Sequence, residues 1–293
     1  MTASCLAISN LSATLANATR VLRSVSLSVQ PGEVRALVGE SGAGKSMIGK
    51  AVLGVLPPSV RIVEGTIALE GRDLGTLALK DRRRLIGERT ALIPQDPLTA
   101  LNPSRRIGPQ MTDRLVKILG WDGARADKRI RHLLDEVRIR EPDRVIRSYP
   151  HELSGGMRQR VLIAAAFAAE PRLIVADEPT TALDVTVQKQ ILRLIAALQR
   201  EHGTALLFVT HDLGVVSKIA QQVTVLYAGK VVEEADVETL FAAPRHAYTR
   251  ALMAATPSYT DPGASLKPVE AGVLAELAAE IAAADQGWRP AHG

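Results

Sequence analysis

The chain of 293 residues has a formal net charge of +5, is 46% apolar and contains one cysteine, Cys5. Its length suits one large domain or two modest ones with a well-filled core. The longest central apolar run, Val161 to Ala169, is far shorter than the roughly 20 residues of a membrane-spanning helix. The first charged residue is Arg20, so the start does not look like a secretory signal. We therefore expect a globular chain in the cytoplasm, without an internal disulfide, a structural metal or an iron–sulfur cluster.

The basic residues gather in four stretches, at 82–84, 105–106, 125–131 and 138–147. Solvated helical faces are the ordinary explanation of such clusters. Nucleic-acid binding is an alternative, but aromatic residues make up only 3% of the chain and none precedes Trp121, so no stacking platform accompanies the charge. A surface that lies against an anionic lipid leaflet fits about as well.

A phosphate-binding loop follows the first strongly apolar strand, which we expect from Val34 to Val38. The loop has the pattern G-x-x-x-x-G-K-S, and its residues are Gly39, Glu40, Ser41, Gly42, Ala43, Gly44, Lys45 and Ser46. Glycines let backbone N–H groups curl around phosphate oxygens, while Lys45 reaches the β- and γ-phosphates and the Ser46 hydroxyl ligates Mg²⁺. A helix should begin there, with the positive end of its dipole toward the anion.

Three further strands are predicted to end in polar residues suited to phosphate chemistry. The strand Thr90 to Ile93 leads to Gln95, which by itself could also be an ordinary turn residue. The continuous apolar run Leu173 to Ala176 leads to Asp177 and Glu178, and the run "ALLFVT" leads to His211. Because ligands lie beyond the carboxyl ends of parallel strands, Asp177 is placed to hold Mg²⁺. Glu178, which should point the other way along the strand, is placed to orient the attacking water.

A second glycine-rich turn, "ELSGGMRQR", lies between the strand before Gln95 and the strand before Asp177. Ser154 is the expected N-cap of a helix whose buried face begins with Met157, Val161 and Leu162. Gly155 and Gly156 leave the first backbone N–H groups uncovered, so the helix end can bind an anion. If the turn stood alone, however, a capped helix with nothing bound would be the favoured explanation.

These motifs, in this order, resemble the ATP-binding cassette of ABC transporters over nearly the whole chain. The resemblance implies a Walker A motif at 39–46, a Q-loop at Gln95, a signature at 153–159, a Walker B motif at 173–177, a D-loop ending at Asp184 and a switch histidine, His211. It implies that ATP and Mg²⁺ bind, that Ser46, Gln95 and Asp177 serve the metal, and that hydrolysis uses the residues Glu178, His211, Lys45 and Gln95. It also implies that the signature turn and D-loop face the ATP of a second cassette, through Ser154, Gly155, Gly156 and Asp184.

The resemblance implies an α/β fold, namely a P-loop NTPase cassette with a mixed parallel sheet core, an antiparallel β subdomain and a helical subdomain. Short alternating stretches, "SLSV", "GTIAL" and "TALIP", fit the antiparallel region. Residues 96–165 fit the helical subdomain, with apolar positions at helical spacing. These positions are Leu115, Ile118, Leu119, Leu133, Leu134 and Val137.

One departure from the family concerns the adenine. Cassettes commonly stack an aromatic residue on this base, from a loop about two dozen residues before Walker A, but the stretch "LANATRVL" contains none. Val21 is the remaining apolar candidate for the adenine face. We expect weaker or less base-selective nucleotide binding as a result.

The C-terminal part, "PRHAYT" at 244–249, resembles the motif of ATP-binding subunits of oligopeptide, dipeptide and nickel importers. We therefore divide the chain into a cassette, 1–240, and an importer-type extension, 241–293. For Tyr248 we expect helix packing and no catalytic role. A Pro/Gly linker at 257–268 precedes an Ala-rich amphipathic helix, "AGVLAELAAEIAAADQ", which we expect to be loosely held.

The resulting hypothesis is an ATPase subunit of an importer for peptides or similar solutes, on the cytoplasmic face of the inner membrane. Its implied partners are a second cassette, two permease subunits and an extracytoplasmic solute-binding protein. The second cassette is expected to be a paralogue, with a second copy of this chain as the alternative. A nickel or other small-solute importer is one alternative, and an exporter is another. From a different class, a soluble ABC ATPase acting on nucleic acid or ribosomes would fit one cassette less well, because those usually have two cassettes or a long coiled coil.

Overall fold

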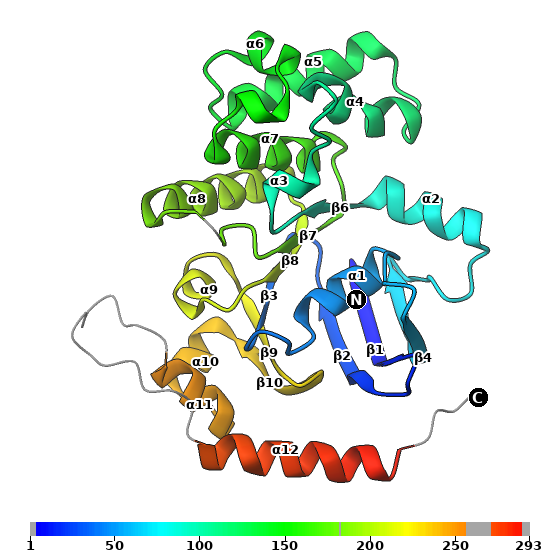
Figure 1. The fold of residues 1–293 in the computed structure, drawn as a ribbon, viewed down its shortest axis with the longest axis vertical. Coiled ribbons are helices and arrows are strands. Elements are labelled where there is room, and N and C mark those ends of the chain that lie inside the picture. The colour runs from blue at the N-terminus through cyan, green and yellow to red at the C-terminus, as the bar shows by residue number, and fades with distance from the viewer. Residues whose placement is uncertain (1–3, 182, 256–270, 289–293) are drawn as a thin grey trace. The chain divides into compact units, whose positions relative to one another are not determined.

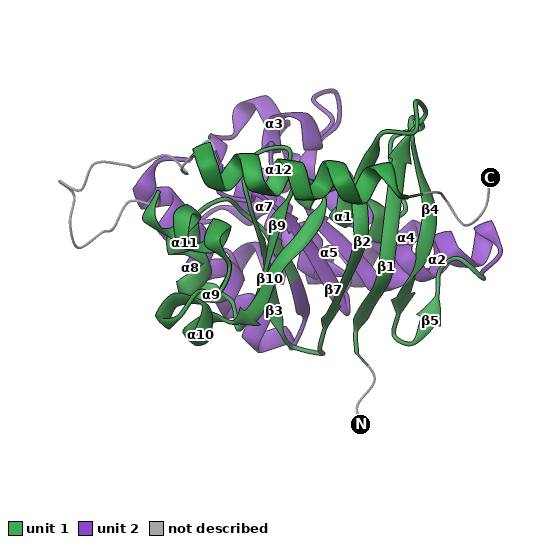
Figure 2. Ribbon diagram, turned by 90° about the horizontal axis from the view of Figure 1, so that it is seen from below, with its two compact units in different colours: residues 1–76, 207–293 green, residues 77–206 purple. Residues whose placement is uncertain are grey.

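The computed structural model describes residues 4–181, 183–255 and 271–288 (Figure 1). The chain divides into two compact units (Figure 2). The first contains residues 1–76 and 207–293, so it joins the P-loop to the C-terminal extension expected at 241–293, and the second contains residues 77–206. The linker predicted at 257–268 lies outside the described residues.

The first unit contains an antiparallel sheet with the strand order β2-β1-β4-β5. Its strands are β1 (Leu6–Leu15), β2 (Arg20–Val29), β4 (Val60–Leu69) and β5 (Arg72–Asp73). The stretches "SLSV" and "GTIAL" lie in β2 and β4, which confirms the antiparallel prediction for them. For "TALIP" the prediction was wrong, since β6 (Thr90–Ile93) pairs in parallel with β7 (Leu173–Asp177) in the second unit. An edge strand of a parallel sheet is partly exposed and can alternate too, and Leu92 is 43% exposed.

The first unit also contains the strands that lead to the P-loop and the histidine. The strand β3 (Val34–Val38) is buried at every position and pairs in parallel with β9 (Gln222–Tyr227), while β10 (Lys230–Asp236) pairs with β9 in antiparallel fashion. The unit boundary falls within β8 (Ala205–Val209), whose last residues neighbour β3. The predicted strand at Val34–Val38 is confirmed.

The helices of the first unit are α1 (Lys45–Val52), α9 (Leu213–Ile219), α10 (Val237–Ala242), α11 (Ala247–Ala254) and α12 (Ala271–Gln286). Helices α9, α10, α11 and α12 share one apolar cluster, in which Leu277 of α12 and Tyr248 of α11 pack with Val38 and Leu240. Leu277 is only 5% exposed and Ile281 only 8%. The Ala-rich helix is therefore present as predicted, but our expectation that it is loosely held was wrong, because its apolar stripe is buried in the core of this unit.

The second unit is mainly helical outside β6 and β7. Its elements are α2 (Leu79–Arg89), α3 (Pro97–Ala100), α4 (Ile107–Lys117), α5 (Gly123–Glu136), α6 (Pro142–Arg147), the 3-10 helix η1 (Pro150–Glu152), α7 (Gly155–Ala168) and α8 (Val185–His202). Leu115, Leu133 and Leu134 are buried, which confirms the predicted helical spacing. The helical spacing predicted at Ile118 and Leu119 was wrong, because α4 ends at Lys117, and Ile118 at its C-cap is 47% exposed. In the described part of the chain, every helix is too short or too polar to span a bilayer.

Candidate nucleotide-binding site

The P-loop connects the buried strand β3 to α1, which begins at Lys45 as predicted. Gly39, Gly42 and Gly44 have φ angles of 152°, 82° and 97°, a region that favours glycine. The side chain of Lys45 is nearly buried, and its Nζ donates to the carbonyl oxygens of Gly39 at 2.7 Å and Glu40 at 2.9 Å. The lysine therefore holds the loop curled, with the N-terminus of α1 at its end.

This loop fits a polyphosphate. A methyl group built on Gly42 would meet no atom within 4 Å, so the loop is open at its tip. At Gly39, by contrast, it would lie 2.2 Å from the carbonyl oxygen of Leu226, which fixes the start of the loop against β9. Backbone amides, an ammonium group and the Ser46 hydroxyl form the donor and ligand set that phosphate oxygens and Mg²⁺ require.

Two other predicted residues lie in the same unit as the P-loop. The backbone N–H of Thr210 donates to Leu37 O at 3.1 Å, so the end of β8 is tied to β3, and the exposed His211 follows directly. Val21 lies in β2, half-buried, and a methyl group on Gly44 would be 3.3 Å from its carbonyl oxygen. The chain at Val21 thus lies against the end of the P-loop, while its role at the adenine stays a prediction.

Sequence reasoning missed a contact between the C-terminal region and the P-loop. The hydroxyl oxygen of Tyr248 accepts a 3.3 Å hydrogen bond from the backbone N–H of Glu40. Tyr248 is fully buried, its ring lies 5.0 Å from that of Tyr227, and burial raises the pKa of its phenol to about 12. The packing role predicted for Tyr248 is confirmed, and the hydrogen bond adds a polar link to Walker A. The hydroxyl of a buried tyrosine usually has a hydrogen-bond partner, so the packing role predicted for Tyr248 already implied such a bond.

In the second unit the structure brings together Gln95 and Glu178. Gln95 Nε2 donates to Glu178 Oε2 at 3.2 Å, and Thr181 Oγ1 donates to the same oxygen at 2.9 Å. The parallel pairing of β6 with β7 explains the meeting, because both residues follow the carboxyl ends of these strands. Thr181 was not singled out from the sequence, although a threonine three residues after an acid at a turn is a recognisable local pattern.

The reason we gave for the direction of Glu178 was wrong. The strand β7 ends at Asp177, which is half-buried, and Glu178 has a φ of 45°, in the left-handed region. Glu178 thus lies outside the strand, and the alternation of side chains along β7 does not determine where its side chain points. A left-handed residue at this point turns the chain, and the two hydrogen bonds to Oε2 fix the carboxylate instead.

The signature turn begins a helix as predicted. Ser154 is the N-cap of α7, and its Oγ accepts from the N–H of Met157 at 3.3 Å. Ser154 and Gly155 are exposed, and a methyl group on Gly155 would meet nothing within 4 Å. On the other side of the turn, Gly156 packs toward Val187 of α8. The end of the helix is therefore open to an external anion.

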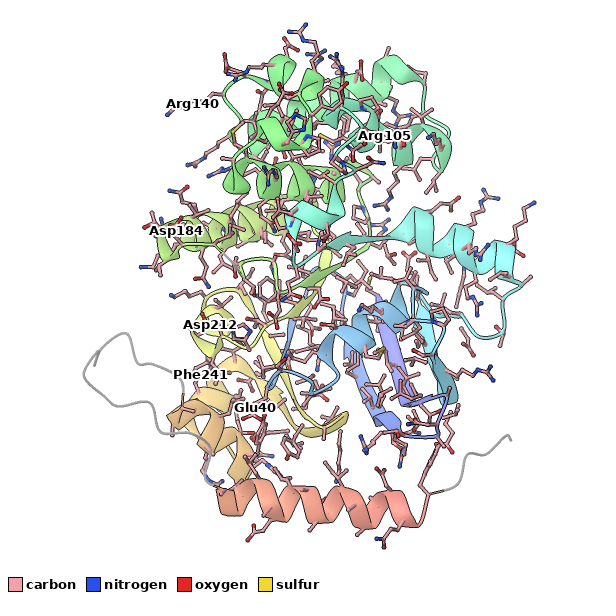
Figure 3. All side chains as sticks on the ribbon, viewed as in Figure 1. Glu40, Arg105, Arg140, Asp184, Asp212 and Phe241 are labelled. Atoms are coloured by element: carbon pink, nitrogen blue, oxygen red, sulfur yellow. The ribbon has the colours of Figure 1, made fainter. Side chains whose placement is uncertain are left out.

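Two polar side chains connect this helix and α8 to the loop after Walker B. Gln159, the last residue of the predicted signature, is 1% exposed and donates from Nε2 to Pro179 O at 2.7 Å. Asp184 is the N-cap of α8, accepting from the N–H groups of Thr186 at 3.0 Å and Val187 at 2.9 Å (Figure 3). The structure thus gives Asp184 a local capping role, and its role toward a second cassette stays a prediction.

Comparison with known families matches two parts of the chain. Residues 22–181 match the family described as "ABC transporter". Residues 232–280 match the family described as "Oligopeptide/dipeptide transporter, C-terminal region". The first match covers the P-loop, Gln95, the signature turn and Glu178, and the second covers Tyr248 and most of α12.

The chain is similar in sequence to several ATP-binding proteins of transporters. The chain is 47% identical over 261 residues to the "Probable peptide ABC transporter ATP-binding protein y4tR" of Sinorhizobium fredii, covering 88% of this chain and 78% of that one. It is 45% identical to the "Peptidoglycan transport ATP-binding protein YejF" of Agrobacterium fabrum, covering 89% of this chain but only half of that protein.

Solved structures show the same fold. The protein cbiO1 of Clostridium perfringens, described as part of the ABC transporter complex cbiONQ, superposes with a TM-score of 0.72 at 24% identity, over 85% of this chain and 95% of that one. The ATP-binding cassette MJ0796, in a dimeric post-hydrolysis state bound to ADP and Pi, superposes with a TM-score of 0.69 at 25% identity, over 79% of this chain and 98% of that one.

Proposed function

We propose that this chain, which belongs to the ABC transporter family and is an ATPase, energises the import of peptides or similar small solutes. The observation that carries the proposal is the match of residues 232–280 to the C-terminal region of oligopeptide and dipeptide transporters. The ATPase part alone would fit many transporters, because it supplies energy without contacting the solute. The match of the C-terminal region favours oligopeptide and dipeptide transporters over other ABC transporters.

The P-loop is proposed to hold the phosphates of ATP. Its backbone N–H groups and the N-terminus of α1 face the anion, and Lys45 meets the charge of the β- and γ-phosphates. Ser46, Gln95 and Asp177 are proposed to hold Mg²⁺, whose oxygen-seeking chemistry they match. An ion held by these residues would supply positive charge to offset the negative charge that develops in phosphoryl transfer.

Glu178 is proposed to orient and polarise the attacking water. Its carboxylate oxygen Oε2 accepts hydrogen bonds from Gln95 and Thr181, and these bonds orient the side chain. His211 is proposed to contact the γ-phosphate, and Val21 the adenine, both by analogy with the family. Positioning and electrostatic stabilisation then account for catalysis, since phosphoryl transfer needs little covalent participation by the protein.

We propose that the active assembly contains two cassettes. The open helix end at the signature turn, together with Asp184 at the N-cap of α8, would complete the ATP site of the second cassette. The residues proposed to face that second nucleotide are Ser154, Gly155, Gly156 and Asp184. The partner cassette would be a paralogue or a second copy, and the remaining partners would be two permease subunits and a solute-binding protein, with this chain peripheral on the inner membrane.

The ATPase assignment is tested by measuring phosphate release and ATP binding with the purified chain. Glu178→Gln keeps the shape of the side chain but removes its charge, so it should still bind ATP while nearly abolishing turnover. Glu201→Gln, an exposed acid at the end of α8, is the matched control and should leave both measurements unchanged. Undiminished turnover by Glu178→Gln would remove this residue from its proposed role.

The importer assignment needs a separate measurement. Purification of the chain from its own cells should recover membrane permeases, and loss of the chain should abolish uptake of a labelled dipeptide. Recovery of nucleic acid or ribosomes would instead favour the soluble ATPase. Intact dipeptide uptake together with lost nickel uptake would favour the nickel importer.

A further inference from the structure

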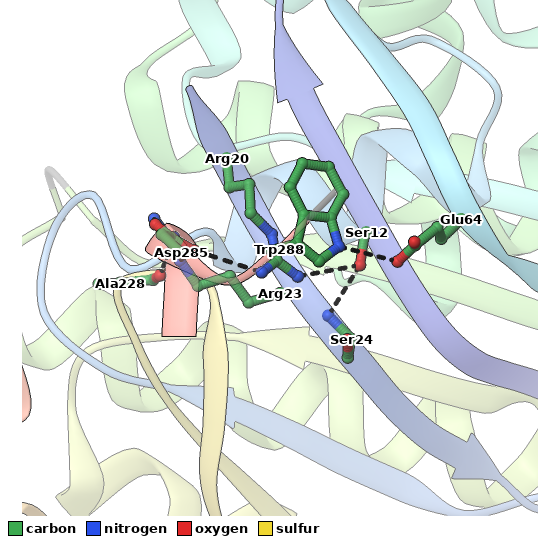
Figure 4. A network of polar contacts seen from close by, with 8 residues as sticks. All are labelled: Ser12, Arg20, Arg23, Ser24, Glu64, Ala228, Asp285 and Trp288. Atoms are coloured by element: carbon green, nitrogen blue, oxygen red, sulfur yellow. Dashed lines mark hydrogen bonds and ion pairs between the residues drawn. The ribbon is translucent and has the colours of Figure 1, made fainter. Parts of the chain in front are cut away.

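The end of α12 is fastened to β2 by a polar network that lies beyond residues 232–280, the part matched by the C-terminal family (Figure 4). Asp285, at the end of this helix, accepts hydrogen bonds from two arginines of β2. Arg23 binds it with three contacts, from Nε at 3.0 and 3.1 Å and from Nη2 at 2.6 Å. Arg20 adds a fourth, from Nη1 at 3.3 Å.

Trp288, three residues after Asp285, makes a second set of contacts with the sheet. The ring of Trp288 lies over the guanidinium of Arg20, at 4.2 Å from its carbon to the ring centroid, and Trp288 Nε1 donates to Glu64 Oε2 at 3.2 Å. Arg20 is only 9% exposed and also donates to Ser12 Oγ. A cation over an indole ring is attracted to it, more strongly where water is excluded. The tail is therefore held to the sheet by charge and by packing.

Arg23 also binds the turn between β9 and β10, so it links Asp285 to that turn. Its Nη1 donates to the carbonyl oxygen of Ala228, and its backbone N–H donates to Gly229 O at 2.8 Å. Ala228 and Gly229 have φ angles of 43° and 78°, so both central residues of the turn are left-handed. Alanine is rarely found in this conformation, and the guanidinium bond to its carbonyl helps to hold it there.

The same turn supports the P-loop directly. The N–H of Gly229 donates to Ala43 O at 2.9 Å. A methyl group on Gly44 would lie 3.3 Å from Gly229 Cα, and one on Gly229 would lie 2.2 Å from Val21 O. The turn, β2 at Val21 and the P-loop are therefore in backbone contact, so a shift of the turn would move the loop that binds phosphate.

We propose that Asp285 is a positioning residue for nucleotide binding: by holding Arg23 it fixes the Ala228–Gly229 turn, which in turn holds the P-loop in its binding conformation. The inference rests on the proposed function only in assuming that this P-loop binds ATP. It extends that function by making the affinity of the nucleotide site depend on the attachment of the C-terminal helix. Because coupling is reciprocal, bound nucleotide should also tighten the attachment of α12.

The first test is equilibrium titration of the full chain with ATP. Asp285→Asn removes the negative charge that pairs with Arg20 and Arg23, and the dissociation constant for ATP should rise about three- to tenfold. The effect is modest because a partly exposed ion pair contributes little free energy and only part of that free energy affects the P-loop. Asp285→Glu, which restores the carboxylate, should recover most of the affinity. Glu276→Gln, an exposed acid on the same helix, is the matched control and should bind ATP like the wild type.

The second test asks whether Asp285 acts through Arg23. Arg23→Ala should weaken ATP binding at least as much as Asp285→Asn, and the double variant should be no weaker than Arg23→Ala alone. Additive losses would show that Asp285 does not work through Arg23 and would overturn the proposed route. The KM for ATP should rise in Asp285→Asn with little change in kcat, whereas a general loss of folded protein would lower the apparent kcat.

Hydrogen exchange provides a readout that simple destabilisation would not reproduce. Added ATP should slow amide exchange in residues 271–286 of the wild type, and this protection should be much reduced in Asp285→Asn. Equal ATP affinity in wild type and Asp285→Asn, or equal protection in both, would overturn the proposal. If the wild type itself fails to bind ATP, the proposed function fails instead, so the two failures are distinguishable.

Discussion

Gln95 Nε2 donates a 3.2 Å hydrogen bond to Oε2 of Glu178, across two loops that follow neighbouring parallel strands. The acceptor is a carboxylate oxygen that already receives the hydroxyl of Thr181 at 2.9 Å. The glutamine after β6 is therefore linked to the acid after β7. A displacement of the loop at Gln95, by a partner subunit for example, would remove one of the two bonds that orient this carboxylate.

The contribution of the second bond can be measured with Thr181→Val, which keeps the shape of the side chain but removes its hydroxyl. A hydrogen bond to a charged group contributes about 1.5–3 kcal/mol, and part of this serves the orientation of Glu178. We expect kcat for ATP hydrolysis to fall roughly tenfold, with less than a twofold change in ATP affinity. Thr186→Val, at an exposed position of α8, is the control. An unchanged kcat would show that Gln95 alone is sufficient to orient the acid.

The strands and the P-loop could be predicted from the sequence because their signals are local. A short, mostly apolar strand before a glycine-rich loop determines β3 and the start of α1, and apolar runs determine β7 and β8. The direction of Glu178 could not be predicted, because it depends on a left-handed residue and on partners from other loops. "TALIP" was misassigned for a related reason: alternation is the same in an antiparallel strand and in a half-exposed edge strand.

The attachment of the C-terminal helix α12 to the sheet could not be predicted from the sequence either. An Ala-rich segment after a Pro/Gly linker has the composition of a loosely held tail. Its fastening depends on Asp285 and Trp288, which are separated from Arg20 and Arg23 by more than 250 residues of sequence. Ion pairs across such a separation leave no periodic signal, and only the three-dimensional arrangement shows them.

The signature turn should act on a nucleotide held by another chain. Ser154→Arg should bind ATP at its own P-loop within twofold of the wild type, yet hydrolysis should be lost at the site that this turn completes. Loss of the N-cap destabilises α7 by about 1 kcal/mol, so Ser154→Asn, which keeps a capping side chain, is measured beside it to separate folding from function. Loss of ATP binding in Ser154→Arg would show that the turn acts within its own chain.

If two copies of this chain form the pair, mixing provides a sharper version of this experiment. Ser154→Arg and Lys45→Ala should each be inactive alone, because each damages both sites of a symmetric pair. In a mixed pair, one site combines an intact P-loop with an intact signature turn, so part of the activity should return. Activity that returns only after addition of a different cassette would identify a paralogous partner.

Tyr248→Phe tests the hydrogen bond from the C-terminal region to the P-loop. Glu40 N–H would lose its 3.3 Å partner, so we expect a loss of about 0.5–1.5 kcal/mol of folding stability and an ATP dissociation constant about two- to fivefold higher. Equal affinity and equal stability in the two proteins would show that the hydroxyl only occupies space.

The pH dependence of stability gives an independent check on Tyr248. Burial raises the pKa of its phenol to about 12, above the value of about 10 in an unfolded chain. Below pH 10 the phenol is neutral in both states, and its contribution to stability is fully present. Between pH 10 and 12 the unfolded state ionises first, so stability is lost as pH rises. Urea unfolding at pH 9 to 11 should show a steeper loss for the wild type than for Tyr248→Phe.

The lack of an aromatic residue near Val21 should appear in nucleotide selectivity. Stacking on a base contributes about 1–3 kcal/mol, so without it the wild type should discriminate weakly between ATP and GTP. Val21→Tyr offers a ring from the strand that lies against the end of the P-loop, and it should tighten ATP binding roughly tenfold. Val21→Ala, which removes only part of a half-buried aliphatic side chain, should change the affinity much less. Competition titrations with both nucleotides measure these differences. Strong rejection of GTP by the wild type would mean that another residue recognises the base, and no gain in Val21→Tyr would place the adenine away from this strand.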